Sequence, residues 1–436
     1  MKSSKNFLNI KIWEKLVAKI LFDIDKNTYR ITHNPLFFSS NLNLFPILMN
    51  KKEKNFDDIF NKHANTTFFL KLFSDSIPDG FGLKIFQSYC YAKNISFDQM
   101  DFIDKIYYIG KRGIGALEFF SQNDTNNYSF ELMIDTPIIM KDIIQTLQII
   151  LDKGKSINLE FNKNHLQKKL LTVFSICTTA GGMRPKAVIA QNKSGEIFSE
   201  FSDYANNCDF WIMKLDGIKD NRFGSPKNFA KIEFAYYLMA LEAGIRMPEC
   251  KLHEENGRFH FMSKRFDRQN GKKIHSQTLY NIAGYDNNKP GKYSYEQCFD
   301  IIKNLNISYK DRKEFFKRMV FNVIARNQDD HTKNISFLMD NDGSWKLSPA
   351  YDITFSYSLS NKWTRYHQMS INGKLDNFSI SDITSIGELN EIENPKKIVL
   401  NIVDVVKRWD HFAKKVKLEQ YKMEKIKQSH RTNIID

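Results

Sequence analysis

The sequence predicts an α+β protein with a mixed N-terminal part and a mostly helical C-terminal part. Strand-like alternation marks residues 13–50, whereas helical spacing of apolar residues prevails from Tyr295 onward. The 436 residues exceed one compact core and indicate about two or three lobes. Hydrophobic residues make up 42% of the chain and charged residues 26%, which is typical of globular proteins with an ample core.

The N-terminal elements follow from local patterns of turn residues and apolar spacing. We expect short strands over 13–50 with a hairpin turn at Asp25–Asn27, and a helix within 68–91 after the turn at 78–80. A glycine-punctuated segment that begins at Ile109 leads into a further strand. A polar loop at 123–127 and an amphipathic helix over 137–152 follow. We place a boundary near residue 165, which gives an N-terminal domain of 1–165 and a core of 166–436.

From Leu166 the pattern changes. We expect a Gly-Gly turn and a strand at the end of "LQKKLLTVFSICTTAGGMRPKAVIA", and a buried strand in the nearly continuous apolar run "CDFWIMKLDG". Next we expect a helix in "NFAKIEFAYYLMALEAGI" with Phe234, Tyr237, Leu238 and Leu241 on one face, and a strand in "RFHFMSKRFDR". A further helix is expected in "DRKEFFKRMVFNVIARNQ", where Phe315, Met319 and Ile324 have helical spacing.

Charge, cysteine usage and hydropathy limit the classes of protein to which this chain can belong. The net charge of +14 favours anionic partners, but the basic residues are spread without dense runs, so charge alone does not predict nucleic-acid binding. The 5 cysteines are far apart with no CxxC pair, so we expect core residues in a reducing cytosol rather than disulfides or a zinc site. There is no signal-peptide pattern and no run of about 18 apolar residues. We therefore expect a soluble, cytoplasmic protein with no membrane partner.

The stretch "RNQDDHTKNISFLMDNDGSWKLSPAYDITF" concentrates carboxylate and amide side chains after the last predicted helix. Asp329 and Asn334 have the Asp-x-x-x-x-Asn spacing of the protein-kinase catalytic loop. That chemistry needs a carboxylate to accept the proton of an attacking hydroxyl and an amide oxygen to help hold magnesium. A solvated loop is the alternative, because Asp and Asn are common in turns.

A hairpin about Asn341–Gly343 would return the chain to the same place and deliver Asp352, a second candidate metal ligand. His331 and Lys333 lie between the two acidic positions, where a donor or cation could contact a γ-phosphate. The order helix, loop, hairpin and aspartate favours a phosphate and metal site over a plain loop.

Upstream residues could bind the remaining phosphates. Lys214 lies within a predicted buried strand and needs an anionic partner unless the strand is at an edge, where the side chain would reach solvent. Glu233, on the following helix, is a candidate partner. The Gly181-Gly182 turn lets backbone N–H groups approach an anion, and Arg184 and Lys186 add charge there. It lacks the Gly-Lys-Ser/Thr of a Walker A loop, and "GKRGIG" at 110–115 is better explained as a structural turn.

These segments together resemble the HipA-type serine/threonine kinases, the toxins of bacterial toxin–antitoxin modules. "NQDDHTKNISF" and "LSPAYDI" carry the specific part of the resemblance. Looser matches follow in the family's order, from about Trp13 to about Trp409: "LFSDSIPDGFG", "YIGKRGIGALEF", "GGMRPKA", "DFWIMKLD", "EFAYYLMALEAGIRMPEC" and "KRFDR".

The resemblance implies a protein-kinase-like fold with a small N-terminal mixed β/α domain and a mostly helical C-terminal lobe. It implies ATP and Mg²⁺ as cofactors. By its motifs the residues take these roles: Asp329 as catalytic base, Asn334 and Asp352 as magnesium ligands, Lys214 as the ATP-phosphate lysine, Gly181 and Gly182 in the phosphate-side loop, and Lys264 to Phe266 as the hinge that receives adenine through backbone groups.

The resemblance also implies partners. Family members phosphorylate proteins, including aminoacyl-tRNA synthetases, and are restrained by a helix-turn-helix antitoxin, so nucleic acid is expected only through that partner and the chain alone is expected to be a monomer. Where relatives carry a regulatory serine before the Gly-rich loop, this chain has Thr178 and Thr179. The alternatives are a catalytically silent binding module in a repressor complex, a small-molecule phosphotransferase and a nucleic-acid-processing protein.

Overall fold

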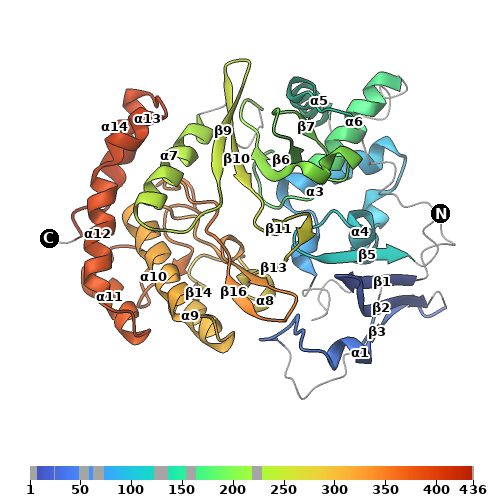
Figure 1. Ribbon diagram of the computed structural model, residues 1–436, viewed down its shortest axis with the longest axis horizontal. Coiled ribbons are helices and arrows are strands. Elements are labelled where there is room, and N and C mark those ends of the chain that lie inside the picture. Colours follow the sequence, from blue (N-terminus) through green and yellow to red (C-terminus); the bar gives the residue numbers. More distant parts are fainter. Residues whose placement is uncertain are drawn as a thin grey trace.

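The computed structural model describes residues 7–23, 25–48, 58–61, 73–121, 136–153, 164–218 and 228–434. The chain crosses the molecule from an N-terminal sheet at one end to a layer of C-terminal helices at the other, with a second sheet between them (Figure 1). The expected combination of a mixed N-terminal part and a mostly helical C-terminal part is confirmed. Within the described ranges, no helix has the length and apolarity needed to cross a membrane.

The N-terminal sheet is antiparallel and has the strand order β4-β3-β2-β1-β5. Its strands are β1 (Phe7–Ile12), β2 (Lys15–Asp23), β3 (Thr28–His33), β4 (Asp58–Asn61) and β5 (Leu117–Ser121). Asp23 pairs with Thr28, which confirms the predicted turn between these residues. The expectation of strands as far as residue 50 is wrong for residues 34–48, because Asn34 caps the short helix α1 (Pro35–Phe38), which Pro35 initiates, and no strand follows it there; residues 49–50 lie outside the described residues.

Among the described residues, four α-helices lie between β4 and the second sheet in the sequence: α3 (Gly80–Ala92), α4 (Phe102–Ile109), α5 (Met140–Lys153) and α6 (Asn164–Cys177). The predicted helices within 68–91 and over 137–152 correspond to α3 and α5. Before α3, Ser74–Ser76 form a short 3₁₀ helix and residues 77–79 are irregular, and residues 68–72 lie outside the described residues. The predicted loop at 123–127 also lies outside them. The boundary near residue 165 stays a prediction, because residues 154–163 beside it are not described.

The second sheet has the order β7-β6-β8-β10-β9 and shares one hydrophobic core with α3, α5 and α6. Its strands are β6 (Lys186–Gln191), β7 (Ile197–Phe198), β8 (Asp209–Lys214), β9 (Cys250–Glu255) and β10 (Arg258–Lys264). The prediction that the apolar run around β8 is buried holds for one face only. Trp211 and Met213 are buried, whereas Phe210, Ile212 and Lys214 on the other face are partly open.

Helix α7 (Phe229–Glu242) buries a different face from the predicted one. Ala235, Tyr236 and Met239 are fully buried, whereas Leu241 is exposed. The other members of the predicted face, Phe234, Tyr237 and Leu238, are only partly buried. The helix is apolar nearly all round, so apolar spacing alone could not decide which face packs against the core. The small alanine side chains allow the closest approach to neighbouring elements.

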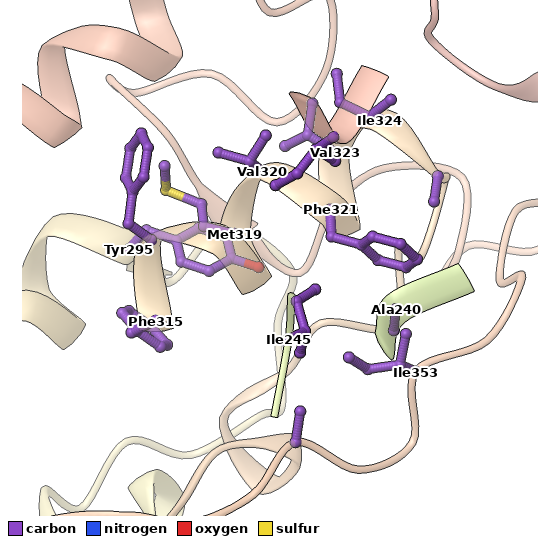
Figure 2. Close-up of a cluster of buried hydrophobic side chains, with 14 of the residues drawn as sticks. Ala240, Ile245, Tyr295, Phe315, Met319, Val320, Phe321, Val323, Ile324 and Ile353 are labelled. Carbon is purple, nitrogen blue, oxygen red and sulfur yellow. The ribbon is translucent and has the colours of Figure 1, made fainter. Parts of the chain in front are cut away.

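The C-terminal part is built around α10 (Tyr309–Ile324), the predicted helix before the acidic stretch. Phe315, Met319 and Ile324 are buried as expected, and Figure 2 shows them packed near Ile245 and Ile353. The remaining elements are β11 (Arg268–Gln269), β12 (Lys272–Lys273), β13 (His275–Thr278), α8 (Leu279–Ile282), β14 (Tyr293–Ser294), α9 (Tyr295–Asn304), β15 (Ser336–Met339), β16 (Trp345–Leu347), β17 (Met369–Ser370), α11 (Ile380–Leu389), α12 (Pro395–Lys407), α13 (Trp409–Lys415) and α14 (Gln420–Ser429).

The predicted hairpin about Asn341–Gly343 is confirmed, because β15 and β16 pair antiparallel across it. Four of the cysteines, Cys90, Cys177, Cys250 and Cys298, are buried thiols as expected, and Cys208 is partly exposed.

Candidate functional site

The centre of the site is Lys214, at the end of β8. Its ammonium Nζ lies 2.5 Å from Glu233 Oε1 of α7 and 2.6 Å from Asp352 Oδ1, beyond the β15–β16 hairpin. The predicted pairing of Lys214 with Glu233 is therefore confirmed. The edge-strand alternative is wrong, since β8 lies inside the sheet between β6 and β10. The following helix and a distant segment beyond the hairpin thus converge on this one cation.

A second lysine gives the site an excess of positive charge on the strands. Lys186 of β6 pairs directly across the sheet from Lys214 and is buried. Like charges at this separation repel, so the surrounding carboxylates are needed for the strands to pair. Burial lowers the pKa of Lys214, but Asp352 and Glu233 outweigh it and hold that pKa above its usual range. Burial alone would raise the pKa of Asp352, yet Lys214 and Lys186 hold it well below its ordinary value.

The hairpin and the core beneath it fix Asp352. Its φ of 53° places it in the left-handed region, which non-glycine residues seldom adopt. The next residue, Ile353, is buried in the C-terminal core and anchors the backbone. On the other side the Tyr351 hydroxyl donates to the Lys333 carbonyl at 2.7 Å. These contacts hold an uncommon conformation that directs the carboxylate towards Lys214.

Asp329 lies on the loop after α10 with its carboxylate about half exposed, accessible to a molecule outside the protein. The Asn334 amide Nδ2 donates to the Asp329 carbonyl at 2.8 Å, which closes the loop between these two residues. His331 Nε2 lies 3.8 Å from Asp329 Oδ1. The structure therefore brings Asp329, His331 and Asn334 together on one short loop, as their spacing predicts.

Asp330 braces this loop from behind and was missed in the sequence analysis. Its buried carboxylate accepts from the Tyr295 hydroxyl at 2.8 Å and the Gln368 N–H at 2.8 Å, and lies 2.7 Å from His367 Nδ1. His367 Nε2 is in turn 2.9 Å from the Arg431 guanidinium. Asp330 therefore ties the loop to the last described residues of the chain. The only signal in the sequence was the doubled "DD".

The Gly-Gly loop binds a carboxylate of the protein itself. The N–H of Gly182, whose φ is 99°, donates to Asp79 Oδ1 at 2.6 Å. The other oxygen of Asp79 lies 2.6 Å from Lys333 Nζ. Lys186 Nζ donates to the Gly181 carbonyl at 2.5 Å. The predicted approach of this loop to an anion is thus seen, but the anion is Asp79, a residue that the sequence analysis did not single out.

Comparison with known proteins identifies the family. The profile of the HipA-like C-terminal domain matches residues 178–434, more than half of the chain. The chain belongs to the HipA-like family.

Relatives at lower coverage agree with that assignment. The chain is 30% identical over 156 residues to "Putative kinase Y4dM" of Sinorhizobium fredii, covering 33% of this chain and 36% of that protein. It is 29% identical over 147 residues to "Putative kinase" of Haemophilus influenzae, covering 29% of this chain and 42% of that protein. The chain therefore spans only about two fifths of the length of these curated relatives.

The solved complex of HipA, HipB and operator DNA from Shewanella oneidensis contains a similar fold. The likeness covers 98% of this chain and 96% of that chain, with a TM-score of 0.65 and 16% identity. The HipA-like fold expected from the sequence is thereby confirmed, and the likeness extends over the N-terminal part as well as over the residues matched by the family profile.

Two backbone N–H groups of the predicted hinge of this HipA-like chain already donate hydrogen bonds to neighbouring backbone carbonyls. The Lys264 N–H donates to the Glu249 carbonyl at 2.9 Å, and the Arg265 N–H donates to the Phe210 carbonyl at 2.8 Å. Phe266, which follows them, is the hinge residue whose N–H is not part of these two bonds. The assignment of Lys264 and Phe266 to adenine binding stays a prediction.

The two threonines before the Gly-Gly loop are buried. The Thr178 hydroxyl donates to the Phe174 carbonyl at 2.8 Å and accepts from the buried Arg112 guanidinium at 2.9 Å. Thr179 is also buried. A phosphoryl group could reach either hydroxyl only after the loop left this position. Regulatory phosphorylation of Thr178 or Thr179 therefore stays a prediction that requires loop movement.

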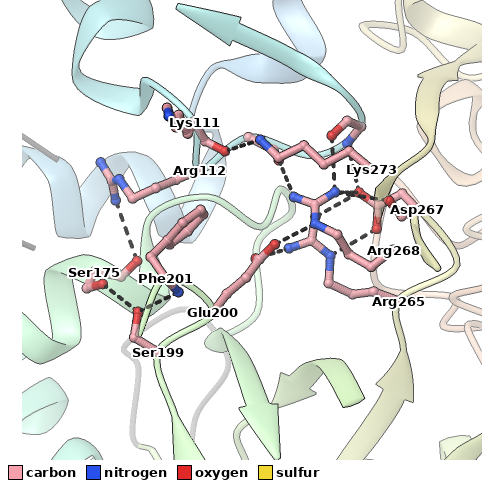
Figure 3. A network of polar contacts seen from close by, with 12 residues as sticks. Lys111, Arg112, Ser175, Ser199, Glu200, Phe201, Arg265, Asp267, Arg268 and Lys273 are labelled. Atoms are coloured by element: carbon pink, nitrogen blue, oxygen red, sulfur yellow. Dashed lines mark hydrogen bonds and ion pairs between the residues drawn. The ribbon is translucent and has the colours of Figure 1, made fainter. Parts of the chain in front are cut away.

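A buried ionic network joins the N-terminal domain to the strand that carries the hinge (Figure 3). Arg265 and Arg268 both pair with Glu200 and with Asp267. The Gly115 N–H donates to Asp267 Oδ2 at 2.7 Å, and its carbonyl accepts from Arg268 at 3.1 Å. These bonds explain "GKRGIG" as a structural turn, as predicted, and connect it rigidly to the hinge.

The donor set fits magnesium without forming a complete metal cage. Asp352 and Asp329 offer carboxylate oxygens and Asn334 an amide oxygen, the hard donors that Mg²⁺ prefers. Across the described ranges no group of three or more His, Cys, Asp or Glu side chains is arranged to hold a metal. Mg²⁺ commonly binds one or two carboxylates and takes its other ligands from water and substrate phosphates. The residues present suit that mode.

Proposed function

We propose that this HipA-like chain is an ATP- and Mg²⁺-dependent protein kinase that transfers the γ-phosphate to a serine or threonine hydroxyl. The observation that carries the proposal is the convergence of Glu233 and Asp352 on Lys214, at 2.5 and 2.6 Å. A strand lysine held by a helix glutamate and placed beside a metal-binding aspartate is the arrangement that kinases use to hold ATP. The names of the curated relatives support the same activity.

Each residue then has a role suited to its surroundings. Lys214 and Lys186 attract the phosphates, because both ammonium groups face the same site. Asn334 and Asp352 would hold Mg²⁺, which neutralises phosphate charge when bound. Asp329, half exposed on its loop, would accept the proton of the substrate hydroxyl as that oxygen attacks the γ-phosphorus and ADP departs. His331 and Lys333 complete the phosphate side of the loop.

The protein acceptor and the partner follow from the family. We propose that the chain acts in the cytoplasm as a toxin on a component of translation, such as an aminoacyl-tRNA synthetase, and is restrained by a helix-turn-helix antitoxin. The Shewanella oneidensis structure of HipA with HipB and operator DNA supports such a partner. DNA would then be engaged through the antitoxin.

Radiolabelled ATP tests the activity. Purified wild type, Asp329→Asn and Asp340→Asn would be incubated with Mg²⁺, [γ-³²P]ATP and a bacterial lysate. Asp340 pairs with Lys346 at 2.9 Å on the β15–β16 hairpin and so controls for loss of a carboxylate outside the site. We expect Asp329→Asn to lower transfer by about 10²- to 10⁴-fold, with unchanged unfolding, while Asp340→Asn stays at the wild-type rate.

The same assay separates the alternatives. Label on a lysate protein, lost in Asp329→Asn, supports a protein kinase and gives a band to identify. Label only on small molecules indicates a small-molecule phosphotransferase. ATP binding in a thermal-shift measurement without transfer indicates the silent binding module. Absence of both ATP binding and transfer would contradict the roles given to Lys214 and Asp352.

A further inference from the structure

A segment of the N-terminal domain is fastened to the core beside the site. The Thr278 N–H donates to Asp75 Oδ2 at 2.7 Å, and the Thr278 hydroxyl donates to Asp75 Oδ1 at 2.8 Å. The Asn281 amide donates to the Ser74 hydroxyl at 3.1 Å. Thr278 caps α8, which contacts the short 3₁₀ turn at Thr332–Asn334. The position of residues 74–76 is therefore fixed relative to the catalytic loop.

The residues that follow fit against the Gly-Gly loop backbone to backbone. The Phe81 N–H donates to the Gly182 carbonyl at 2.9 Å. A Cβ added at Gly80 would lie 2.4 Å from the Gly182 oxygen, and one added at Gly82 would lie 2.6 Å from the Thr178 oxygen. Only glycine permits this approach without displacing the loop. The start of α3 and the loop before β6 therefore form one packed unit.

Asp79 joins that unit to the catalytic loop. Its two carboxylate oxygens have different partners, the Gly182 N–H and the Lys333 ammonium, each at 2.6 Å. Burial alone would raise the pKa of Asp79, but Lys333 and the Gly182 N–H outweigh it and hold the pKa below its usual value. The same pairing holds the pKa of Lys333 above its usual value against the effect of burial. Both groups are therefore charged at neutral pH.

We infer that Asp79 is a positioning residue of the phosphoryl-transfer site: its carboxylate sets Lys333 of the catalytic loop at a fixed place relative to the Gly-Gly loop. The inference rests on the proposed function. Asp79 lies outside the residues matched by the family profile, 178–434, so the N-terminal domain completes the site that the core contains. Displacing a positioned group by about 1 Å can reduce turnover on the order of 10²-fold, which is why a fixed Lys333 matters.

The test is a double-mutant cycle on transfer from ATP. Asp79→Asn retains an oxygen for the Gly182 N–H but removes the charge opposite Lys333, and Lys333→Met removes the other charge. We expect each single variant to lower kcat about 10- to 100-fold with a much smaller change in the KM for ATP. We expect Asp79→Asn to cause no further loss in the Lys333→Met background, because the aspartate acts through the lysine.

Asp340→Asn is the matched control. Its side chain is 42% exposed against 36% for Asp79, and each carboxylate pairs with one lysine. We expect wild-type kcat and KM for this variant. Equal losses in Asp79→Asn and Asp340→Asn would overturn the inference, because they would show a general effect of lost charge. Additive losses in the Asp79 and Lys333 variants would also overturn it. Faster transfer or tighter ATP binding in Asp79→Asn would show that the carboxylate competes with phosphate instead.

A measurement independent of kinase activity separates this inference from the proposed function. Hydrogen exchange of the peptide that contains Gly182 would be followed in wild type, Asp79→Asn and Asp79→Ala. We expect faster exchange in Asp79→Ala, which lacks an acceptor for the Gly182 N–H, and near wild-type exchange in Asp79→Asn. Unchanged exchange in Asp79→Ala overturns the inference even if the chain is a kinase. The expected exchange with no transfer by wild type refutes the proposed function and leaves the contact established.

Discussion

Replacing Glu200 by glutamine tests the buried network behind the hinge. Glu200 is 5% exposed and bonds Arg265 and Arg268, whose side chains are almost completely buried. Arg268 Nε lies 2.5 Å from Glu200 Oε1. Asp267 supplies the only other carboxylate bonded to these guanidinium groups within the described ranges. Two positive and two negative charges thus balance, and Glu200→Gln leaves one buried positive charge uncompensated at nearly unchanged volume.

The expected loss is large because the remaining charge cannot return to water. Breaking a buried ion pair by neutralising one partner costs about 3–5 kcal/mol. Glutamine keeps one acceptor oxygen but cannot accept from both guanidinium groups, so we expect a value within that range. An exposed pair such as Asp340–Lys346 contributes about 0–1 kcal/mol, which makes Asp340→Asn the control.

Urea unfolding followed by circular dichroism and by tryptophan fluorescence measures both variants. We expect Glu200→Gln to unfold at lower urea with an unchanged slope, and Asp340→Asn to overlay wild type. A loss below about 1 kcal/mol in Glu200→Gln would refute the reasoning, because it would mean that water or a rearranged side chain compensates the guanidinium groups.

Two further variants test buried basic side chains elsewhere, one neutral and one charged. Burial lowers the pKa of His275 to about 3, and neither ring nitrogen has a partner among the described residues. Between that value and 6.5 the unfolded chain binds a proton that the folded chain does not, so stability is fully present above pH 6.5 and falls by about 1.4 kcal/mol per pH unit on acidification. His275→Phe should remove this contribution, so the free energy of unfolding measured in urea should fall less steeply on acidification than in wild type. An unchanged dependence of that free energy on pH would contradict the assignment. Arg431→Met removes the contact to His367 behind Asp330 and should cost about 1.5–3 kcal/mol; unfolding at the wild-type midpoint would count against a role for Arg431 in holding the loop.

The sequence was most informative where the chemistry is local. Asp329 and Asn334 share one loop, and the predicted hairpin precedes Asp352, so local spacing alone was enough to predict both features. Lys214 and Glu233 lie on consecutive elements, and the need of a strand lysine for an anion predicted their contact. The turn at Asp25–Asn27 followed from the same kind of local rule.

Contacts between distant segments could not be predicted in this way. Asp79 resembles an ordinary turn aspartate until the fold brings it to Lys333, 254 positions later in the chain. Glu200 belongs to no motif and Arg265 was noted only as part of the hinge match "KRFDR", so nothing in the sequence predicted that they form a buried pair. The face of α7 that was singled out proved to be only partly buried, because apolar residues surround that helix and their spacing does not identify the core face.

The contacts behind the Asp329–Asn334 loop have a consequence for when the chain can complete the proposed site. The Arg431 N–H donates to the Ile324 carbonyl at 2.9 Å, and Arg326 Nε donates to the Ser429 carbonyl at 2.8 Å, so the end of α10 is secured by residues made about a hundred positions later. A nascent chain whose residues 429–431 are still inside the ribosome already contains the lysines and carboxylates of the site. It lacks the support that holds Asp330 and, beside it, Asp329. Under the proposed function, competence for transfer would therefore arise only after residues 429–431 have emerged from the ribosome, and a partner or fusion that drew these residues away would silence the site from its far side.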